Sequence, residues 1–226
     1  MIERGFVDLA QAGPDGRAAP PHGAGVVHLS APDDARWSGV VELAPRAVLA
    51  LDAGLRHDLF MLRGELADEH GLALRAGDFA SRSTPGRLYA GAGGATLFAY
   101  RQAPGDGRER VVAQDARTWR PGRAPGLAVA PLSDDGHSLT LVDWQPGART
   151  APHAHARGEE IFVLGGELRS GDARLPAGSW LRLHPGEPHA PFAQTPTLIL
   201  LRNGHLRPRA RESSRHEAER CLSARR

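Results

Sequence analysis

Three histidines and one glutamate in the second half of the chain have the types and spacing of a metal site. His153 and His155 are two residues apart, Glu159 follows four residues after them, and His189 comes later in the segment HPGEPHAPF. Side chains two apart on a β-strand point to the same face, so the two imidazoles would converge on one point. Imidazole and carboxylate ligands together suit Zn, Fe, Mn, Cu or Ni better than Ca or Mg. The sequence therefore predicts one transition-metal centre, bound by these four residues.

A simpler explanation exists for the first two histidines. On their own, His153 and His155 could be solvated residues of an edge strand. The addition of Glu159, His189 and the glycines that frame the segment favours the metal site, although short motifs also match by chance.

Short β-strands are the elements expected to position these ligands. The 226 residues include 27 glycines and 18 prolines among many short apolar runs, and no long segment has the 3.6-residue period of a helix. The sequence therefore predicts an all-β fold.

The charge and the cysteine content indicate which partners and which cellular compartment to expect. The formal net charge is only +2, and an arginine-rich tail at residues 205–226 carries much of the positive charge. Such a tail could contact nucleic acid or an acidic partner, but we expect a solvated tail and no nucleic-acid binding. The single cysteine, Cys221, excludes an internal disulfide, and no apolar run has the length of a signal peptide core or a membrane span. We expect a cytoplasmic protein with no membrane contact.

The chain contains an internal repeat. LFMLRGEL at residues 59–66 matches IFVLGGEL at residues 161–168, an offset of about 100 residues. Self-similarity on this scale indicates a duplicated unit. We expect an N-terminal degenerate barrel at residues 1–105, a C-terminal metal-binding barrel at residues 106–204, and the tail at residues 205–226.

The first copy lacks the metal ligands. Leu51 and Ala53 stand at the positions of the histidine pair, His57 at that of the glutamate, and Tyr89 near that of the third histidine. One histidine cannot hold a metal in a four-ligand site. We therefore expect His57 to be a buried or hydrogen-bonded polar residue.

The second half resembles the cupin family through two motifs. The first motif is matched at every spacing, and the second departs only where His184 replaces the usual proline, a change that we interpret as neutral. The residues that match are Gly147, His153, His155, Glu159 and Gly166 in the first motif and Gly178, Gly186 and His189 in the second. The resemblance implies a bicupin, two tandem jelly-roll barrels.

Within the cupins, residues 119–201 resemble the cupin domain of ChrR-type anti-sigma factors and the related dihydroxyacetophenone and acetylacetone dioxygenases. The runs GEEIFVL and PAGSWLR and the closing His189 carry this resemblance. It implies zinc in the regulatory branch and iron(II) in the dioxygenase branch, while manganese or nickel also suits the ligands. The acetylacetone-cleaving branch typically has three histidines without the glutamate, so Glu159 argues against that narrow substrate.

The expected partner is a small-molecule ligand. The helical zinc-binding domain with which ChrR-type factors grip a sigma factor has a His, Cys, Cys cluster, which this sequence lacks. We therefore expect no sigma-factor binding, and a homodimer remains an option.

Two functions follow as hypotheses. The first is a metal-dependent, oxygenase-like enzyme that acts on a small diketone or hydroxyketone, with Trp144, Phe162 and Trp180 as candidate walls and Arg182 as the candidate for binding a substrate oxyanion. The alternative is a non-catalytic zinc-binding sensor or regulatory cupin. An isomerase or a decarboxylase on the same barrel is a third option, because this fold hosts many activities.

Overall fold

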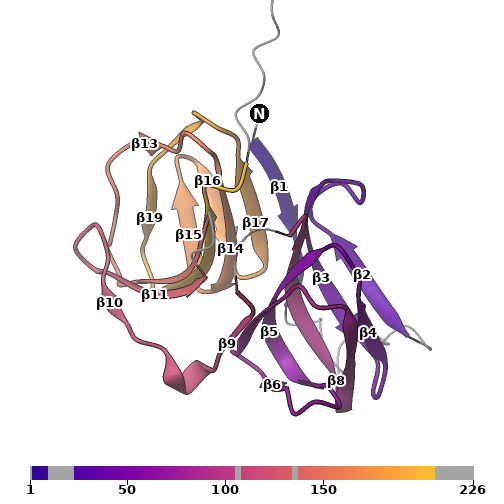
Figure 1. The fold of residues 1–226 in the computed structure, drawn as a ribbon. Coiled ribbons are helices and arrows are strands. Elements are labelled where there is room, and N and C mark those ends of the chain that lie inside the picture. Colours follow the sequence, from indigo (N-terminus) through magenta and orange to yellow (C-terminus); the bar gives the residue numbers. More distant parts are fainter. Residues whose placement is uncertain (1, 10–22, 105–107, 134–136, 207–226) are drawn as a thin grey trace, which may run out of the picture.

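The computed structural model describes residues 2–9, 23–104, 108–133 and 137–206. Apart from one 3₁₀ turn, η1 (Gln114–Ala116), the regular elements of these residues are β-strands. They form two barrels that lie side by side (Figure 1). The all-β, two-barrel prediction is confirmed.

The first barrel is one sheet in the order β2-β3-β8-β5-β7-β9, with β4 and β6 paired to its longer strands. The strands are β2 (Ala24–His28), β3 (Arg36–Leu43), β4 (Val48–Leu51), β5 (Arg56–Ala67), β6 (Ala73–Arg75), β7 (Phe79–Arg82), β8 (Gly86–Gln102) and β9 (Arg110–Val112).

The second barrel combines a large sheet in the order β1-β17-β14-β20-β12-β11-β10 with the smaller sheets β16-β15-β19 and β13-β18. The strands are β1 (Ile2–Phe6), β10 (Arg120–Pro121), β11 (Leu127–Ser133), β12 (Ser138–Trp144), β13 (His153–Ala154), β14 (Glu159–Gly165), β15 (Glu167–Ser170), β16 (Ala173–Pro176), β17 (Ser179–Leu183), β18 (Pro188–His189), β19 (Pro191–Ala193) and β20 (Thr197–Asn203).

Buried apolar side chains form three clusters. One fills the first barrel and one fills the second. The third joins the two barrels and includes the tilted ring pair Phe98 and Phe162, whose centroids are 4.3 Å apart. Because alternate residues of a strand face opposite sides, each sheet contributes one face to its own barrel and the other to this shared core.

Two glycines at matching places show the duplication in three dimensions. Gly64 and Gly166 follow the repeated apolar runs and have φ angles of 73° and 75°. A Cβ atom would lie 2.1 Å from the carbonyl oxygen of Gly94 in the first barrel and 2.2 Å from that of Pro196 in the second. Both positions therefore require glycine, for conformation and for space.

The two barrels exchange a strand. β1 pairs antiparallel with β17 of the second barrel, although residues 1–105 were expected to form the first. In return β9, which lies beyond residue 105, pairs antiparallel with β7 of the first barrel. Hydrophobic periodicity reports that a segment is a strand but not which barrel it joins, so sequence reasoning missed the exchange.

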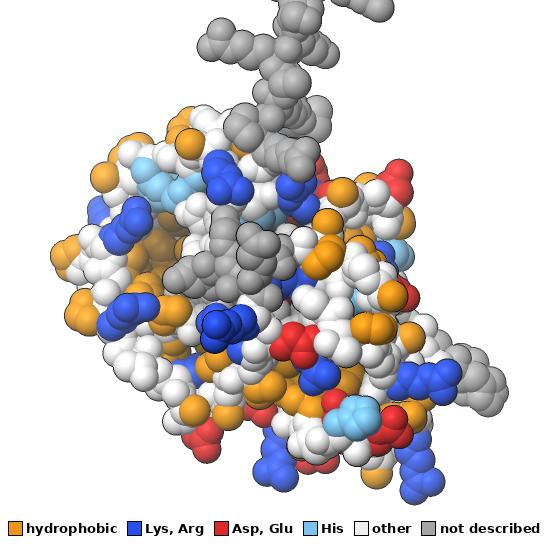
Figure 2. All heavy atoms as spheres, in the orientation of Figure 1, with side chains coloured by type: hydrophobic (Ala, Val, Ile, Leu, Met, Phe, Trp, Pro, Cys, Tyr) orange, Lys and Arg blue, Asp and Glu red, His pale blue; other side chains and the backbone are white. Residues whose placement is uncertain are grey.

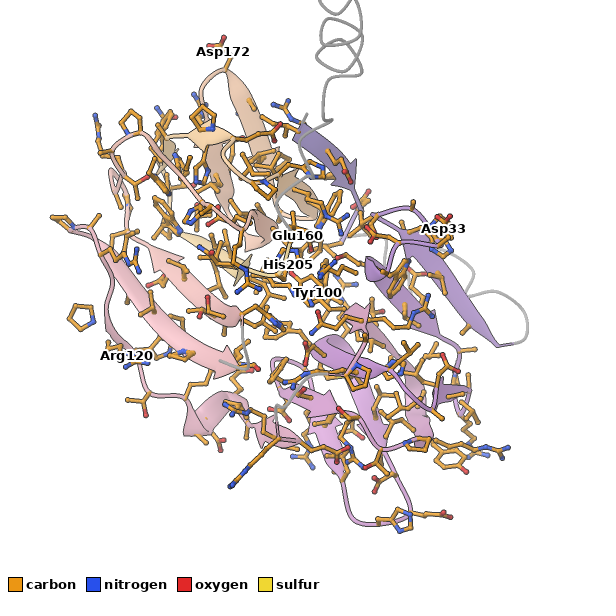
Figure 3. The ribbon with its side chains drawn as sticks, turned by 45° about the horizontal axis from the view of Figure 1, so that its top comes forward. Asp33, Tyr100, Arg120, Glu160, Asp172 and His205 are labelled. Carbon is orange, nitrogen blue, oxygen red and sulfur yellow. The ribbon has the colours of Figure 1, made fainter. Side chains whose placement is uncertain are left out.

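A buried polar cluster accompanies the shared apolar core (Figure 3). Glu160 is fully buried and accepts hydrogen bonds from the Arg182 guanidinium and from the Ser38 hydroxyl, the latter at 2.7 Å. His205 Nε2 lies 3.2 Å from the same carboxylate, and Arg182 also bonds Asp34 of the first barrel. The neighbouring His205 ring and the guanidinium groups of Arg182 and Arg202 hold the pKa of Glu160 well below its usual range, despite the opposing effect of burial. A buried carboxylate at this position therefore stays charged and links the barrels.

The second barrel extends slightly beyond its expected end at residue 204. His205 and Leu206 are buried, with exposed fractions of 3% and 7%. The remainder of the expected tail, residues 207–226, lies outside the described residues. Among the described residues, no helix is long and apolar enough to cross a membrane.

A glycine substitution tests the exchange of β1. A Cβ at Gly178 would lie 1.8 Å from the carbonyl oxygen of Val7, just after β1, whereas one at Gly71 would meet nothing within 4 Å. Both glycines have φ near +90°, so Gly71→Ala controls for backbone strain. We expect Gly71→Ala to cost about 1 kcal/mol and Gly178→Ala about 2–4 kcal/mol of unfolding free energy, measured by urea denaturation. Equal costs would contradict the docking of β1 on β17.

The interface cluster also predicts a pH dependence of stability. Burial lowers the pKa of His205 to about 4 from the ordinary 6.5, so between these values the unfolded state binds the extra proton. The neutral His205 ring therefore contributes fully to the free energy of unfolding above pH 6.5. This contribution falls by about 1–3 kcal/mol as the pH drops to 4. The urea midpoint should decrease from pH 7 to pH 4.5 in both proteins, and the decrease should be larger for the wild type than for His205→Gln. Parallel falls would show that His205 does not titrate in this way.

Candidate metal centre

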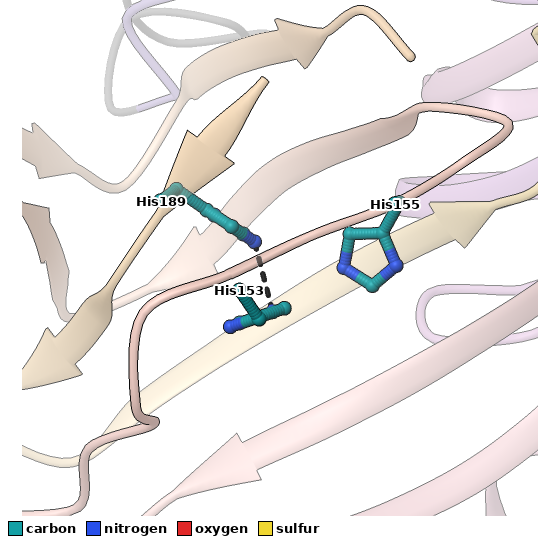
Figure 4. A group of neighbouring side chains, drawn as sticks. All are labelled: His153, His155 and His189. Carbon is teal, nitrogen blue, oxygen red and sulfur yellow. Dashed lines mark hydrogen bonds between the residues drawn. The ribbon is translucent and has the colours of Figure 1, made fainter. Parts of the chain in front are cut away.

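Two short strands bring the three histidines together at one end of the second barrel. β13 pairs antiparallel with β18, and His153 lies directly opposite His189 in this register. His155 follows β13, and its ring centroid is 5.0 Å from that of His153. One ring nitrogen from each histidine lies within 4.8 Å of the others (Figure 4). Figure 2 shows histidine atoms at the surface of this barrel near β13.

The glutamate joins the histidines from the start of β14. Glu159 is 3% exposed, and its Oε2 lies 2.9 Å from His155 Nε2. Its Oε1 lies 3.3 Å from His189 Nε2. The structure thus gathers the four residues that the sequence singled out.

Hydrogen bonds orient the ring of His153. Its Nδ1 lies 2.8 Å from the carbonyl oxygen of Ala151, and because a carbonyl only accepts, Nδ1 carries the hydrogen. The neutral ring then has its lone pair on Nε2, which lies 2.9 Å from His189 Nε2. The hydrogen bond from Nδ1 to Ala151 therefore leaves His153 Nε2, which faces His189, available to bind a metal.

Asn203 plays the same part for His155, and sequence reasoning missed it. Its side-chain amide lies 2.7 Å from His155 Nδ1, and it sits opposite Glu159 in the pairing of β14 with β20. The oxygen and nitrogen of an asparagine amide are assigned by their surroundings. With the oxygen toward Nδ1–H, the Nε2 lone pair of His155 is free for a metal. No spacing rule of the sequence marks Asn203, because it reaches the site only through sheet pairing.

Unpaired buried atoms test whether a metal fits. His155 Nε2 and Glu159 Oε1 are buried without a hydrogen-bond partner among the described residues. Leaving such groups unpaired costs about 1–3 kcal/mol each, which coordination would offset. Three imidazoles and a carboxylate also suit a first-row transition ion. The residues present therefore fit a metal ion, and the histidine triad could hold one.

Burial sets the protonation of the centre. It lowers the pKa of His189 to about 4, so this ring is neutral near pH 7 and has a lone pair to donate. The carboxylate of Glu159, 2.9 Å from His155 Nε2, favours the protonated ring and raises the pKa of His155. Protons therefore compete with a metal more at His155 than at His189.

A pocket of about 330 Å³ opens beside His189. Leu181 and Leu183 of β17 and Pro188 give it apolar walls, and the exchanged strand β1 contributes Arg4. Its size suits a small organic ligand.

Three of the four candidate substrate residues lie elsewhere. Phe162 and Trp180 belong to the core shared by the two barrels, and Arg182 bonds Glu160 and Asp34 there. On β14 and β17 the alternation of side chains sends these residues to the face opposite Glu159 and Leu181, so their expected role is corrected.

Trp144, the fourth candidate, lies inside the second barrel with its core residues. In the first barrel, His57 is 7% exposed and its Nε2 accepts a hydrogen bond from the backbone of Asp52 at 3.1 Å. The prediction of a buried, hydrogen-bonded residue is confirmed. His184, interpreted as a neutral change, instead places its Nε2 2.6 Å from Glu3 Oε1 and so anchors β1.

Comparison with known proteins agrees with this architecture. Residues 107–207 match the family model of the ChrR cupin-like domain. No match was found among curated proteins.

Solved structures share the fold at low sequence identity. A putative dioxygenase from Nostoc punctiforme is 13% identical, with a TM-score of 0.68 over 92% of this chain and 85% of that chain. HEPD from Streptomyces albus, with 2-hydroxyethylphosphonate and Fe(II) bound, is 11% identical, with a TM-score of 0.68 over 99% and 79%. A cupin 2 conserved barrel domain protein from Leptotrichia buccalis is 17% identical, with a TM-score of 0.57 over 80% and 88%. At these identities the likeness shows the cupin fold.

Substitutions at the centre should change metal content in a graded way. We expect His155→Ala to lose stoichiometric metal, because it removes one ligand, while His70→Ala, an exposed histidine of the first barrel, keeps it. Asn203→Ala should weaken metal affinity about 10–100-fold through loss of the outer hydrogen bond. Elemental analysis and competition with a chelator measure both effects. Full metal content in His155→Ala would overturn the ligand assignment.

Proposed function

We propose that this chain, whose residues 107–207 match the ChrR cupin-like domain, is a metal-dependent enzyme of the oxygenase type that acts on a small diketone or hydroxyketone. The observation that carries the proposal is the convergence of His153, His155, His189 and Glu159 next to an apolar pocket of about 330 Å³. These four residues are the proposed ligands of one divalent transition ion, with iron(II) as the working form.

The protein groups around the ion have separable tasks. A bound divalent ion supplies Lewis acidity and a template that can orient two substrate oxygens. Ala151 and Asn203 hold the histidine rings at fixed angles through their outer hydrogen bonds. Leu181, Leu183 and Pro188 give the space beside His189 apolar walls, against which the apolar part of a small substrate can pack.

The names of two of the similar solved structures support an oxygenase. One is called a putative dioxygenase, and another holds Fe(II) and an oxygen-bearing substrate. Because these likenesses show the fold alone, the substrate class of this chain rests on its own pocket and ligand set.

A sensor that holds zinc is the second candidate, and Glu159 favours it. This carboxylate adds negative charge to the ligand set and thereby weakens the Lewis acidity that catalysis needs. Burial of Glu159 to 3% exposure also suits tight, permanent binding of an ion. The resemblance of residues 107–207 to a regulatory family points the same way.

Turnover by the iron(II)-reconstituted protein separates the two candidates. We expect O₂ uptake with at least one compound of a panel of diketones and hydroxyketones, measured with an oxygen electrode. His155→Ala, treated identically, should show none because its metal centre is incomplete. Absence of O₂ uptake across the panel, together with zinc that resists chelators in protein as purified, would contradict the oxygenase and favour the sensor.

A further inference from the structure

We propose that Arg4, on the exchanged strand β1, binds a carboxylate of the substrate, so that the substrates are small carbonyl compounds with an acidic group at the end remote from the metal. This inference rests on the proposed function and names its substrate class. It replaces Arg182, the arginine that the sequence favoured for this role.

The register of β1 directs Arg4 toward the pocket. Strand β1 lies beside β17 (Figure 1). Arg4 lies opposite Leu181 and Ile2 lies opposite Leu183 in this pairing. Directly opposite residues of an antiparallel pair project to the same face of the sheet. All four of these side chains line the pocket that also includes His189. Arg4 therefore shares a cavity with one of the proposed metal ligands.

The opposite face of β1 is anchored, which fixes where Arg4 stands. Glu3 lies 2.6 Å from His184 Nε2 and 3.6 Å from the Arg182 guanidinium. The backbone N–H of Val7 donates to the carbonyl oxygen of Gly178 at 2.9 Å. These contacts fix the backbone of Arg4, so only its exposed side chain has to be ordered when a ligand binds.

The charge of Arg4 is available to a ligand. Its guanidinium forms no ion pair with any described residue, and none of the residues that line the pocket is acidic. The remaining walls are mostly apolar, and Arg4 is the one arginine among the residues that line the pocket, so a carboxylate held away from the metal would find its partner in Arg4. Guanidinium and carboxylate match in geometry and can form two parallel hydrogen bonds.

The duplicated first barrel provides an internal comparison. There β9 pairs with β7 as β1 pairs with β17, and Val111 lies opposite Ala80 where Arg4 lies opposite Leu181. The barrel without the histidine pair thus has an apolar residue at the equivalent place. Strand β9 also carries an arginine, Arg110, but one position away from Val111 and therefore on the opposite face. An arginine on the face equivalent to that of Arg4 is thus found only in the barrel with the proposed metal ligands, which favours a role in binding.

Binding of one matched pair of compounds tests the inference without turnover. The carboxylate probe is 4,6-dioxoheptanoate, whose diketone can reach the metal while its acid group extends away, and the neutral probe is its methyl ester. Calorimetry on the zinc-loaded full chain gives Kd for both. We expect Arg4→Ala to weaken the carboxylate about 10–100-fold and the ester less than about 3-fold, since a charge-assisted hydrogen bond contributes about 1.5–3 kcal/mol.

Further variants separate binding from a structural role. Arg4→Lys should retain part of the affinity for the carboxylate, and Arg4→Glu should abolish it while keeping a charged sheet edge. Arg75→Ala removes an exposed arginine of the first barrel and should change neither Kd. Equal losses for both probes in Arg4→Ala, or carboxylate affinity retained in Arg4→Glu, would overturn the inference.

The same titrations distinguish a failure of this inference from a failure of the proposed function. If the ester binds the zinc-loaded wild type but not His155→Ala, and the carboxylate binds no more tightly than the ester, Arg4 alone is refuted. If neither compound binds a wild type that elemental analysis shows to be metal-loaded, the diketone function fails together with the inference that rests on it.

Discussion

Strand β14 carries two consecutive buried glutamates to opposite faces of one sheet, and both the site and the assembly of the barrels depend on this alternation. Glu159 turns into the second barrel and meets His155 and His189. Glu160 turns outward and meets Arg182 and His205 between the barrels. Burial of two neighbouring carboxylates destabilises a protein unless each has partners that offset the lost hydration. The residues of the metal centre provide these partners for Glu159, and the residues between the barrels provide them for Glu160. A one-residue slip of β14 would exchange the two environments and destroy both.

The exchange of edge strands extends this dependence to the substrate pocket. β1 completes the sheet of the second barrel, and one of its faces meets the interface through Glu3 while the other faces the pocket through Arg4. A pocket wall is thus delivered by residues that lie nearly the whole described chain away from His189. Duplication explains how this could arise, because an exchanged strand is free to differ between the two barrels once only one of them retains the histidines.

Much of this could be predicted from the sequence, and the remainder could not for definite reasons. The repeat and the spacing of short strands predicted the all-β double barrel, and the motif brought together the four proposed ligands. Asn203 and Arg4 were missed because they reach the site through pairing between distant strands. Arg182 and Trp180 were expected at the site but lie on the opposite face of β17. This strand is buried on both faces, so its sequence does not reveal which side is the barrel interior. Tertiary pairing, rather than local pattern, decides such cases.

An anomalous-difference map of crystals of the protein as purified, collected at the absorption edge of the metal found in it, tests the central claim most directly. The account predicts one strong peak, in the second barrel, about 2.0–2.2 Å from the Nε2 atoms of His153, His155 and His189 and from a carboxylate oxygen of Glu159. A peak coordinated by other residues, or a metal-containing protein with Glu159 outside bonding distance, would contradict it.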